Sequence, residues 1–170
     1  MSRGFVKEED QEEAPFIPPR AALPVGVNNY VTPEGYRDLI KERENLEEKL
    51  SKLNMKDDKE KRHARAVLSG SLNLLKERIS SARILEPSKQ PQDEARFGAR
   101  LKFKILTGKQ KGIIHQFKLV GVDEADIKEN KIAFVAPLAR ALTGKKVGEI
   151  AELSMVGENQ QMEILEIEYS

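Results

Sequence analysis

The chain has no cysteine and no tryptophan, and aromatic residues make up only 5% of it. Without cysteine, a disulfide scaffold, a thiolate zinc site and a cysteine nucleophile are all excluded. The sequence also lacks any apolar run near the ~20 residues of a membrane-spanning helix, and its acidic, proline-containing start has no apolar core like that of a secretory signal. We therefore expect a cytoplasmic protein.

An excess of one charge is also missing, since 29 basic residues balance 28 acidic ones and leave a net charge of +1. This balance gives no overall attraction to nucleic acid, so a basic surface must be local. Catalytic motifs are scarce: His63 and His115 have no partner at metal-ligand spacing, and there is no phosphate-binding glycine loop or nucleophile elbow.

Residues 1–30 form an acidic segment with few apolar side chains. Five acids lie between Glu8 and Glu13, and four prolines follow within the segment. So few apolar groups cannot offset the entropy lost on ordering, which predicts an extended or disordered tail. The tail is either a solvated arm or docks on a partner or on the chain itself through its apolar residues, which are Phe5, Phe16, Ile17 and Leu23.

Residues 31–87 carry two apolar stripes with heptad-like spacing. The stripes are Tyr36, Leu39, Leu46, Leu50 and Leu53, and then Leu68, Leu72, Leu75, Ile79 and Ala82. Thr32 and Pro33 suit a helix start, and Pro87 would end the second helix. The polar stretch from Asn54 to Arg62 separates the stripes and predicts a turn. We expect helix throughout 32–86, folded as an antiparallel coiled-coil hairpin; a helical pair that merely dimerises is the alternative.

From Phe97 the apolar period changes to two, which is typical of half-buried strands. Strands are predicted near 97–105, 113–119, 132–135, 149–155 and 162–169, with one short helix at 137–142 that begins at Pro137. The fold class is therefore α+β: a hairpin at 31–87, followed by a small, mostly antiparallel domain with one short helix at 95–170.

Charged residues gather at the predicted hairpin turn. The bases Lys56, Lys59, Lys61, Arg62 and Arg65 lie within ten residues and predict phosphate or RNA contacts. Three acids, Asp57, Asp58 and Glu60, are interspersed, and Asp57 and Asp58 are candidates for a Mg²⁺ shared with a partner's ligands. The alternative for both sets is a solvated turn.

Several stretches of the chain resemble the Gre family of bacterial transcription elongation factors (GreA/GreB type). They are VTPEG (31–35), SSARILEP (80–87), VGVDEADIKENKIAFVAPLARALTGKKVGEI (120–150) and EILEIEY (163–169). The resemblance covers about 31–170. It implies an FKBP-like fold for roughly 95–170 and RNA polymerase as partner, with the hairpin in the secondary channel of the polymerase and the globular domain at the channel's rim. It implies no cofactor of the chain's own.

Two departures from the family bear on activity. Gre cleavage factors have a tip motif resembling D-L-x-E-N-A-E-Y, whose carboxylates help to place a second Mg²⁺ in the polymerase. This chain lacks the motif, and its predicted hairpin is shorter by about two turns per helix, roughly 10 Å. Where the family commonly has Asp or Asn, then Ser, then Pro, this chain has Val135-Ala136-Pro137. Pro137, Leu138 and Arg140 match the family, and the resemblance implies that they bind the polymerase.

These observations predict a monomeric, non-enzymatic regulator of RNA polymerase that stimulates transcript cleavage weakly or not at all. One alternative is an active cleavage cofactor that uses Asp57, Asp58 and Glu60. An FKBP-like peptidyl-prolyl isomerase is another, although the aromatic residues of this domain lie mostly at inward strand positions that the core needs. A purely structural coiled-coil dimer is the third.

Overall fold

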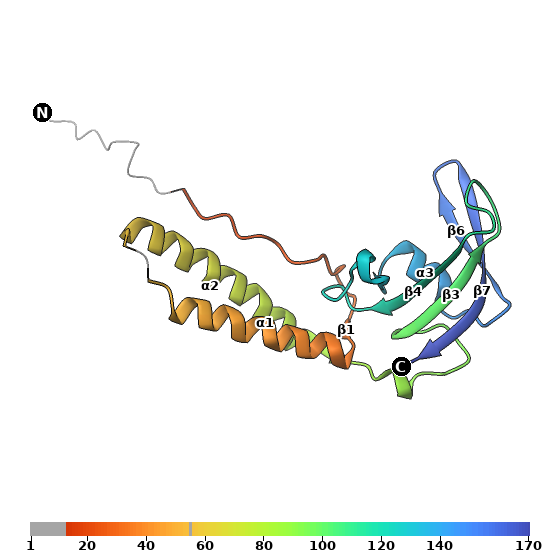
Figure 1. The fold of residues 1–170 in the computed structure, drawn as a ribbon, viewed down its shortest axis with the longest axis horizontal. Coiled ribbons are helices and arrows are strands. Elements are labelled where there is room, and N and C mark those ends of the chain that lie inside the picture. Colours follow the sequence, from red (N-terminus) through yellow and green to blue (C-terminus); the bar gives the residue numbers. More distant parts are fainter. Residues whose placement is uncertain (1–12, 55) are drawn as a thin grey trace, which may run out of the picture.

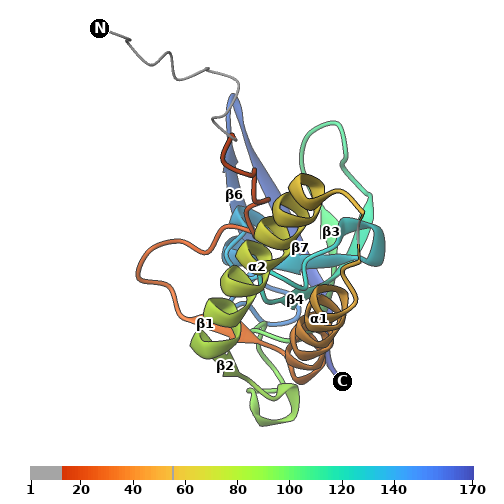
Figure 2. The ribbon, with the colours of Figure 1, turned by 90° about the vertical axis from the view of Figure 1, so that its left-hand side faces the viewer.

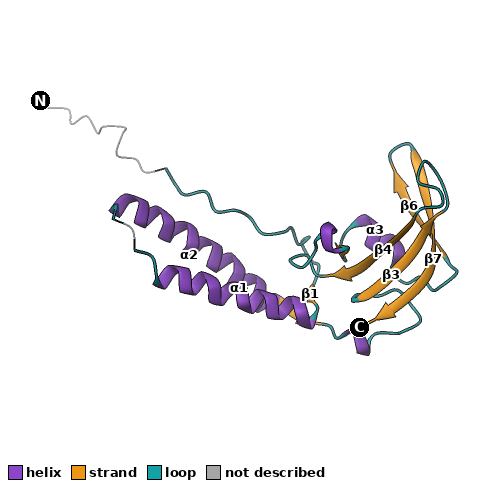
Figure 3. Ribbon diagram, in the orientation of Figure 1, coloured by secondary structure: helices purple, strands orange, loops and turns teal. Residues whose placement is uncertain are grey.

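A computed structural model describes residues 13–54 and 56–170. Two long helices form a rod at one end, and a twisted sheet lies at the other (Figure 1). Figure 3 shows this separation of helix and strand and confirms the α+β class. In chain order the elements are β1 (Asn29–Val31), α1 (Pro33–Ser51), α2 (Asp58–Ser81), β2 (Ala82–Ile84), β3 (Ala99–Ile105), β4 (Ile114–Val120), β5 (Lys131–Ala133), α3 (Pro137–Leu142), β6 (Ile150–Met155) and β7 (Glu158–Tyr169).

Helices α1 and α2, which we call the helix pair, run side by side in opposite directions (Figure 2). Thr32 caps α1 by accepting a hydrogen bond from the Gly35 N–H at 2.9 Å. Leu39 of α1 and Leu75 of α2 are buried against each other and Val31. At 1.5 Å per residue, α2 is ~36 Å long, and among the described residues neither buried cluster includes a side chain from its first two turns.

The turn of the helix pair is shorter than predicted. We expected it to span Asn54–Arg62, but α2 already begins at Asp58. The reason is Asp57, whose Oδ1 accepts a hydrogen bond from the Lys59 N–H at 2.8 Å and so caps α2. The charged residues from 58 onwards therefore lie on a helix.

A two-stranded parallel sheet joins the start and the end of the helix pair. Here the predicted helix through residue 86 is wrong, because α2 ends at Ser81 and β2 pairs with β1, with Asn29 opposite Ala82 and Val31 opposite Ile84. Asn29 Nδ2 also donates to the Arg78 carbonyl at 2.9 Å, which satisfies a carbonyl in the last turn of α2.

The second sheet has the strand order β5-β4-β3-β7-β6. All its neighbouring strands are antiparallel except β4 and β5, which are parallel. The alternation in β3 is as predicted, with Leu101, Phe103 and Ile105 buried on one face. The other four predicted strands and the short helix α3 are also confirmed, with boundaries shifted by a few residues.

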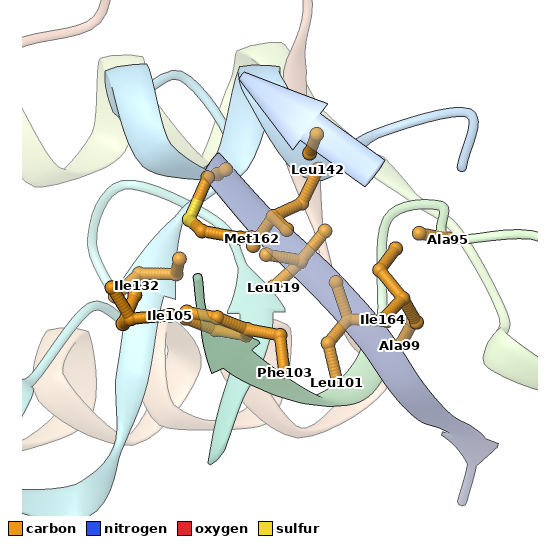
Figure 4. Close-up of a cluster of buried hydrophobic side chains, with 12 residues drawn as sticks. Ala95, Ala99, Leu101, Phe103, Ile105, Leu119, Ile132, Leu142, Met162 and Ile164 are labelled. Carbon is orange, nitrogen blue, oxygen red and sulfur yellow. The ribbon is translucent and has the colours of Figure 1, made fainter. Parts of the chain in front are cut away.

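The main core lies between this sheet and α3 (Figure 4). Leu142 of α3 points toward Met162 of β7 and Leu119 of β4, and all three are fully buried. Because α3 is held by this core, the side chains on its outer surface have a fixed position relative to the sheet.

Residues 13–28 follow an extended course beside α2 without regular secondary structure (Figure 1). Ile17 sits over Gly70 of α2, and Leu74 lines the hollows beside residues 18–23. This part of the tail docks on the chain's own surface. The predictions made for Phe5 and for the acids before Glu13 lie outside the described residues. Within the described ranges, no helix has both the length and the apolarity needed to cross a bilayer.

Candidate functional site

The free end of the helix pair carries the predicted basic residues. Lys56 precedes α2, and the others lie on its first two turns; Lys61 is half-buried and the remaining four are exposed. We call these five residues, Lys56, Lys59, Lys61, Arg62 and Arg65, the basic tip. The tip lies at the opposite end of the molecule from the sheet (Figure 1). Its charges are thus presented at the end of a rod.

The three tip acids have a structural role in α2. Asp57 is the N-cap, and Asp58 and Glu60 lie in the first turn, where negative charge favours the helix dipole. Across residues 13–54 and 56–170, no three or more His, Cys, Asp or Glu side chains are arranged to hold a metal ion. Binding of Mg²⁺ by Asp57 and Asp58 therefore stays a prediction.

The charge balance at the tip favours anions. Lys52, at the end of α1, pairs with Glu48 on the same helix, so its charge is already compensated. Counted over residues 56–65, five bases and three acids leave a formal excess of two positive charges. Phosphate groups are attracted to such an exposed excess, and the attraction weakens as salt rises.

Helix α3 presents the second set of predicted residues. Pro137 begins the helix and is exposed, as is Arg140 one turn later. Leu138 is half-buried and packs against the main core. The two sites lie on different parts of the molecule, with α3 beside the sheet and the tip at the far end of the rod (Figure 1).

The aromatic residues of the globular domain are used for packing. Phe103 is buried in the core. Phe97 and Phe134 pack edge to face at 5.5 Å, and both contact the ring of Tyr30 from β1. The Tyr169 hydroxyl accepts a hydrogen bond from the Arg96 N–H at 2.9 Å, and burial raises the pKa of this tyrosine.

Sequence reasoning missed the residues that join the helix pair to the globular domain. The Thr32 hydroxyl donates to Glu124 Oε2 at 2.6 Å, which ties the start of α1 to the loop after β4. Burial raises the pKa of Glu124, and this hydrogen bond opposes the shift. The available signal was the pair of acids, Asp123 and Glu124, placed directly after the apolar stretch 119–122.

Comparisons with known proteins give the family. The family described as "Transcription elongation factor, GreA/GreB, C-term" matches residues 90–169. Transcription elongation factor GreA of Bartonella henselae is 34% identical over 100 residues, covering 59% of this chain and 62% of the relative. GreA of Acidiphilium cryptum is 34% identical over 108 residues, covering 64% of this chain and 67% of the relative.

Solved structures of similar proteins include GreA factor homolog 1 of Thermus thermophilus, which is 20% identical with a TM-score of 0.38 and covers 84% of this chain and 99% of that one. GreA/GreB from Nitrosomonas europaea is 17% identical with a TM-score of 0.39 and covers 82% of this chain and 98% of that one.

The chain thus spans about 62% of the length of the Bartonella relative that it matches. The family match at 90–169 contains the whole five-stranded sheet and α3. Together with the 34% identity over two thirds of the Acidiphilium factor, this match shows that the chain belongs to the GreA/GreB family of transcription elongation factors.

Proposed function

We propose that this chain binds RNA polymerase, inserts the helix pair into the secondary channel and regulates elongation with weak or no stimulation of transcript cleavage. It acts as a regulatory factor, not as an enzyme, and its place of action is the bacterial cytoplasm, where the polymerase works. Membership in the GreA/GreB family supports the partner. We also propose that the helix pair is a coiled coil and that roughly 95–170 form an FKBP-like domain.

One observation carries this proposal: the basic tip lies at the end of a rod that extends away from the sheet (Figure 1). Among residues 13–54 and 56–170, no core requires a helix pair of this length, because the buried residues of the pair, such as Leu39 and Leu75, lie near the β1 end. A rod with a positive end is suited to a channel that contains RNA phosphates.

The tip acids support the weak-cleavage part of the proposal. Asp57 is engaged in capping α2, and the described part of the chain has no cluster of side chains that would hold a metal by itself. A Mg²⁺ ion at the tip would have to be held mainly by the polymerase. The positive charges around Asp57 and Asp58 also disfavour a cation there.

The globular domain would hold the rim of the channel through α3. Pro137 and Arg140 are exposed on a helix whose position the core fixes, which is the property that a rigid docking surface needs. Leu138 supports this surface from below. In this proposal, α3 anchors the chain at the rim and the basic tip acts inside the channel.

A transcript-cleavage assay tests the proposal. Backtracked complexes of RNA polymerase from the same source are incubated with Mg²⁺, with and without the chain, and then with a cleavage-active Gre factor added. We expect little cleavage from the chain alone and a dose-dependent loss of the added factor's activity, because both occupy one channel. Robust cleavage that disappears in Asp57→Asn/Asp58→Asn/Glu60→Gln would instead make the chain an active cofactor.

The remaining alternatives receive less support. An isomerase needs an open, aromatic-lined pocket for proline, whereas Phe103 is buried and Phe97 and Phe134 pack on Tyr30. A coiled-coil dimer needs unpaired apolar seams, whereas α1 and α2 pack on each other within one chain. We therefore propose a monomer, and a dimer mass in sedimentation analysis would contradict it.

A further inference from the structure

We propose that Arg20 is a positioning residue that fixes the direction of the helix pair relative to the globular domain. The claim concerns the free chain and goes beyond the proposed function, because it holds whether or not the chain binds a polymerase. It rests on a group of four charged side chains at which three separate parts of the chain meet; Arg20, Arg78 and Asp123 are largely buried, and Glu42 is 45% exposed.

Arg20 lies on the segment beside α2 and reaches both other parts. Its Nη1 and Nη2 atoms donate to the two carboxylate oxygens of Glu42 on α1, at 2.8 Å and 3.1 Å. Its Nε donates to Asp123 Oδ1, in the loop after β4, at 3.0 Å. The guanidinium group thus bridges the helix pair and the globular domain with a two-point fork on one side.

A second arginine completes the group. Arg78 of α2 has its Nε atom 3.2 Å from Asp123 Oδ2, and it also donates to the Ala21 carbonyl. The side chains of Arg20, Arg78 and Asp123 are only 17%, 12% and 8% exposed. Two arginines and two carboxylates balance each other, and removing one member would leave a largely buried charge without its partner.

The position of this group along α1 explains why it controls direction. The Thr32–Glu124 hydrogen bond ties only the start of α1 to the globular domain. Tyr30 of β1 packs on Phe97 and Phe134 of the globular domain near the same end of α1. Glu42 lies about 15 Å further along α1 at 1.5 Å per residue, so the Arg20 fork holds α1 at a point away from these contacts and opposes rotation about them.

Small rotations matter because the tip is far from the contacts at the start of α1. Over an α1 length of ~28 Å, a rotation of about 10° moves the tip by roughly 5 Å. The docked segment delivers Arg20 to its place: Ile17 is seated on Gly70 of α2, and Pro18 and Pro19 restrict the backbone immediately before Arg20. Through Arg20, the N-terminal segment therefore restricts movement of the tip relative to the globular domain.

Spin-label distance measurements on the full chain test this proposal, and the absence of cysteine makes labelling specific. Labels are placed at Lys59→Cys on the tip and Lys104→Cys on β3, both of which are exposed. We expect one narrow distance distribution in the parent. In Arg20→Ala it should broaden or shift by roughly 5 Å, the displacement that a rotation of about 10° produces. Arg20→Lys should restore only part of the narrow distribution, because lysine lacks the two-point fork.

Matched variants separate positioning from folding. Arg37→Ala removes an exposed arginine of α1 and should leave the distribution unchanged. Glu42→Gln weakens the same fork from the other side and should broaden the distribution even if Arg20→Ala fails to fold. An unchanged distribution in a folded Arg20→Ala or in Glu42→Gln overturns the proposal. Because no polymerase is present, a failure of the proposed function leaves this result interpretable.

Discussion

Ile17 and Gly70 fit together at the surface of α2, such that a Cβ atom added to Gly70 would lie 2.1 Å from Ile17 Cδ1. Helix propensity alone would make Gly70→Ala stabilising by about 1 kcal/mol. We predict instead that the added methyl group displaces the N-terminal segment. Docking holds Arg20 against Glu42 and Asp123, so trypsin should cleave slowly after Arg20 in the parent. Cleavage there should become faster in Gly70→Ala.

The double variant Ile17→Ala/Gly70→Ala is the control for this prediction. Removing the Ile17 side chain gives the new methyl group room, so cleavage should slow relative to Gly70→Ala and the melting temperature should rise above that of Ile17→Ala. Equal cleavage rates in the parent and Gly70→Ala would show that the docking of Ile17 does not require a residue without a side chain at position 70.

Arg140 is predicted to anchor the chain on RNA polymerase. Arg140→Glu should weaken binding by about fivefold or more, which corresponds to about 1 kcal/mol, because exposed arginines at interfaces are frequent hot spots. Leu138 is unsuitable for this test because it packs on the core. Lys128→Glu, an exposed change of the same charge elsewhere on the domain, is the control. Equal affinities for Arg140→Glu and the parent would place the interface elsewhere.

The basic tip is predicted to contact phosphate in the transcription complex. Replacing Lys59, Lys61 and Arg65 together by glutamine should flatten the dependence of log affinity on log salt by roughly 0.7–0.9 for each phosphate that is no longer neutralised. The control replaces Lys104, Lys109 and Lys111, which are exposed at the opposite end of the molecule. If both triple variants keep the parent's slope, the tip charges are only a solvated surface.

Asp57 is predicted to matter for helix stability more than for metal binding. Asp57→Ala removes the cap of α2 and should cost about 1 kcal/mol of unfolding free energy, whereas Asp57→Asn keeps a good cap and should cost little. Chemical denaturation measures both. Equal losses in the two variants would show that the carboxylate charge, and not the capping hydrogen bond, is what counts.

Glu124 gives a pH dependence with a definite sign. Burial raises the pKa of Glu124 above its ordinary value of 4.5, so the folded chain holds this proton more tightly than the unfolded one. Its contribution to stability is complete below the ordinary value and is lost as the pH rises through the raised pKa. Glu124→Gln cannot ionise and should therefore gain stability relative to the parent over that rise. A difference that stays constant with pH would contradict the assignment.

Local sequence patterns were sufficient for much of the fold. The period-two alternation at Leu101, Phe103 and Ile105 predicts a strand because the residues that decide it are neighbours in the sequence. The end of α2 could not be predicted in this way. Ala82–Ile84 has no strong strand signal and becomes a strand because β1, 53 residues earlier, supplies its backbone partners.

The same distinction holds for the candidate site: groups of residues close in the sequence could be predicted, and contacts between distant residues could not. The clustering of Lys59, Arg62 and Arg65 is visible in the sequence, because residues on adjacent turns of one helix are also close in the chain. The contact between Arg20 and Asp123 joins residues that are 103 positions apart. Asp123 lies in the family-like stretch 120–150, but nothing in the sequence near Arg20 points to it, so only the folded arrangement brings this pair together.

The parallel strands β1 and β2 lie side by side, about 5 Å apart, with β1 leading into α1 and β2 following α2. The helix pair is therefore an insert that begins and ends at one small sheet. Residues can be added to both helices in matched heptads, each extending the rod by about 10 Å, while the sheet and α3 stay unaltered. The length of the helix pair can therefore be varied independently of the globular domain. A series of longer pairs grafted between Val31 and Ala82 would measure the depth of the proposed polymerase channel.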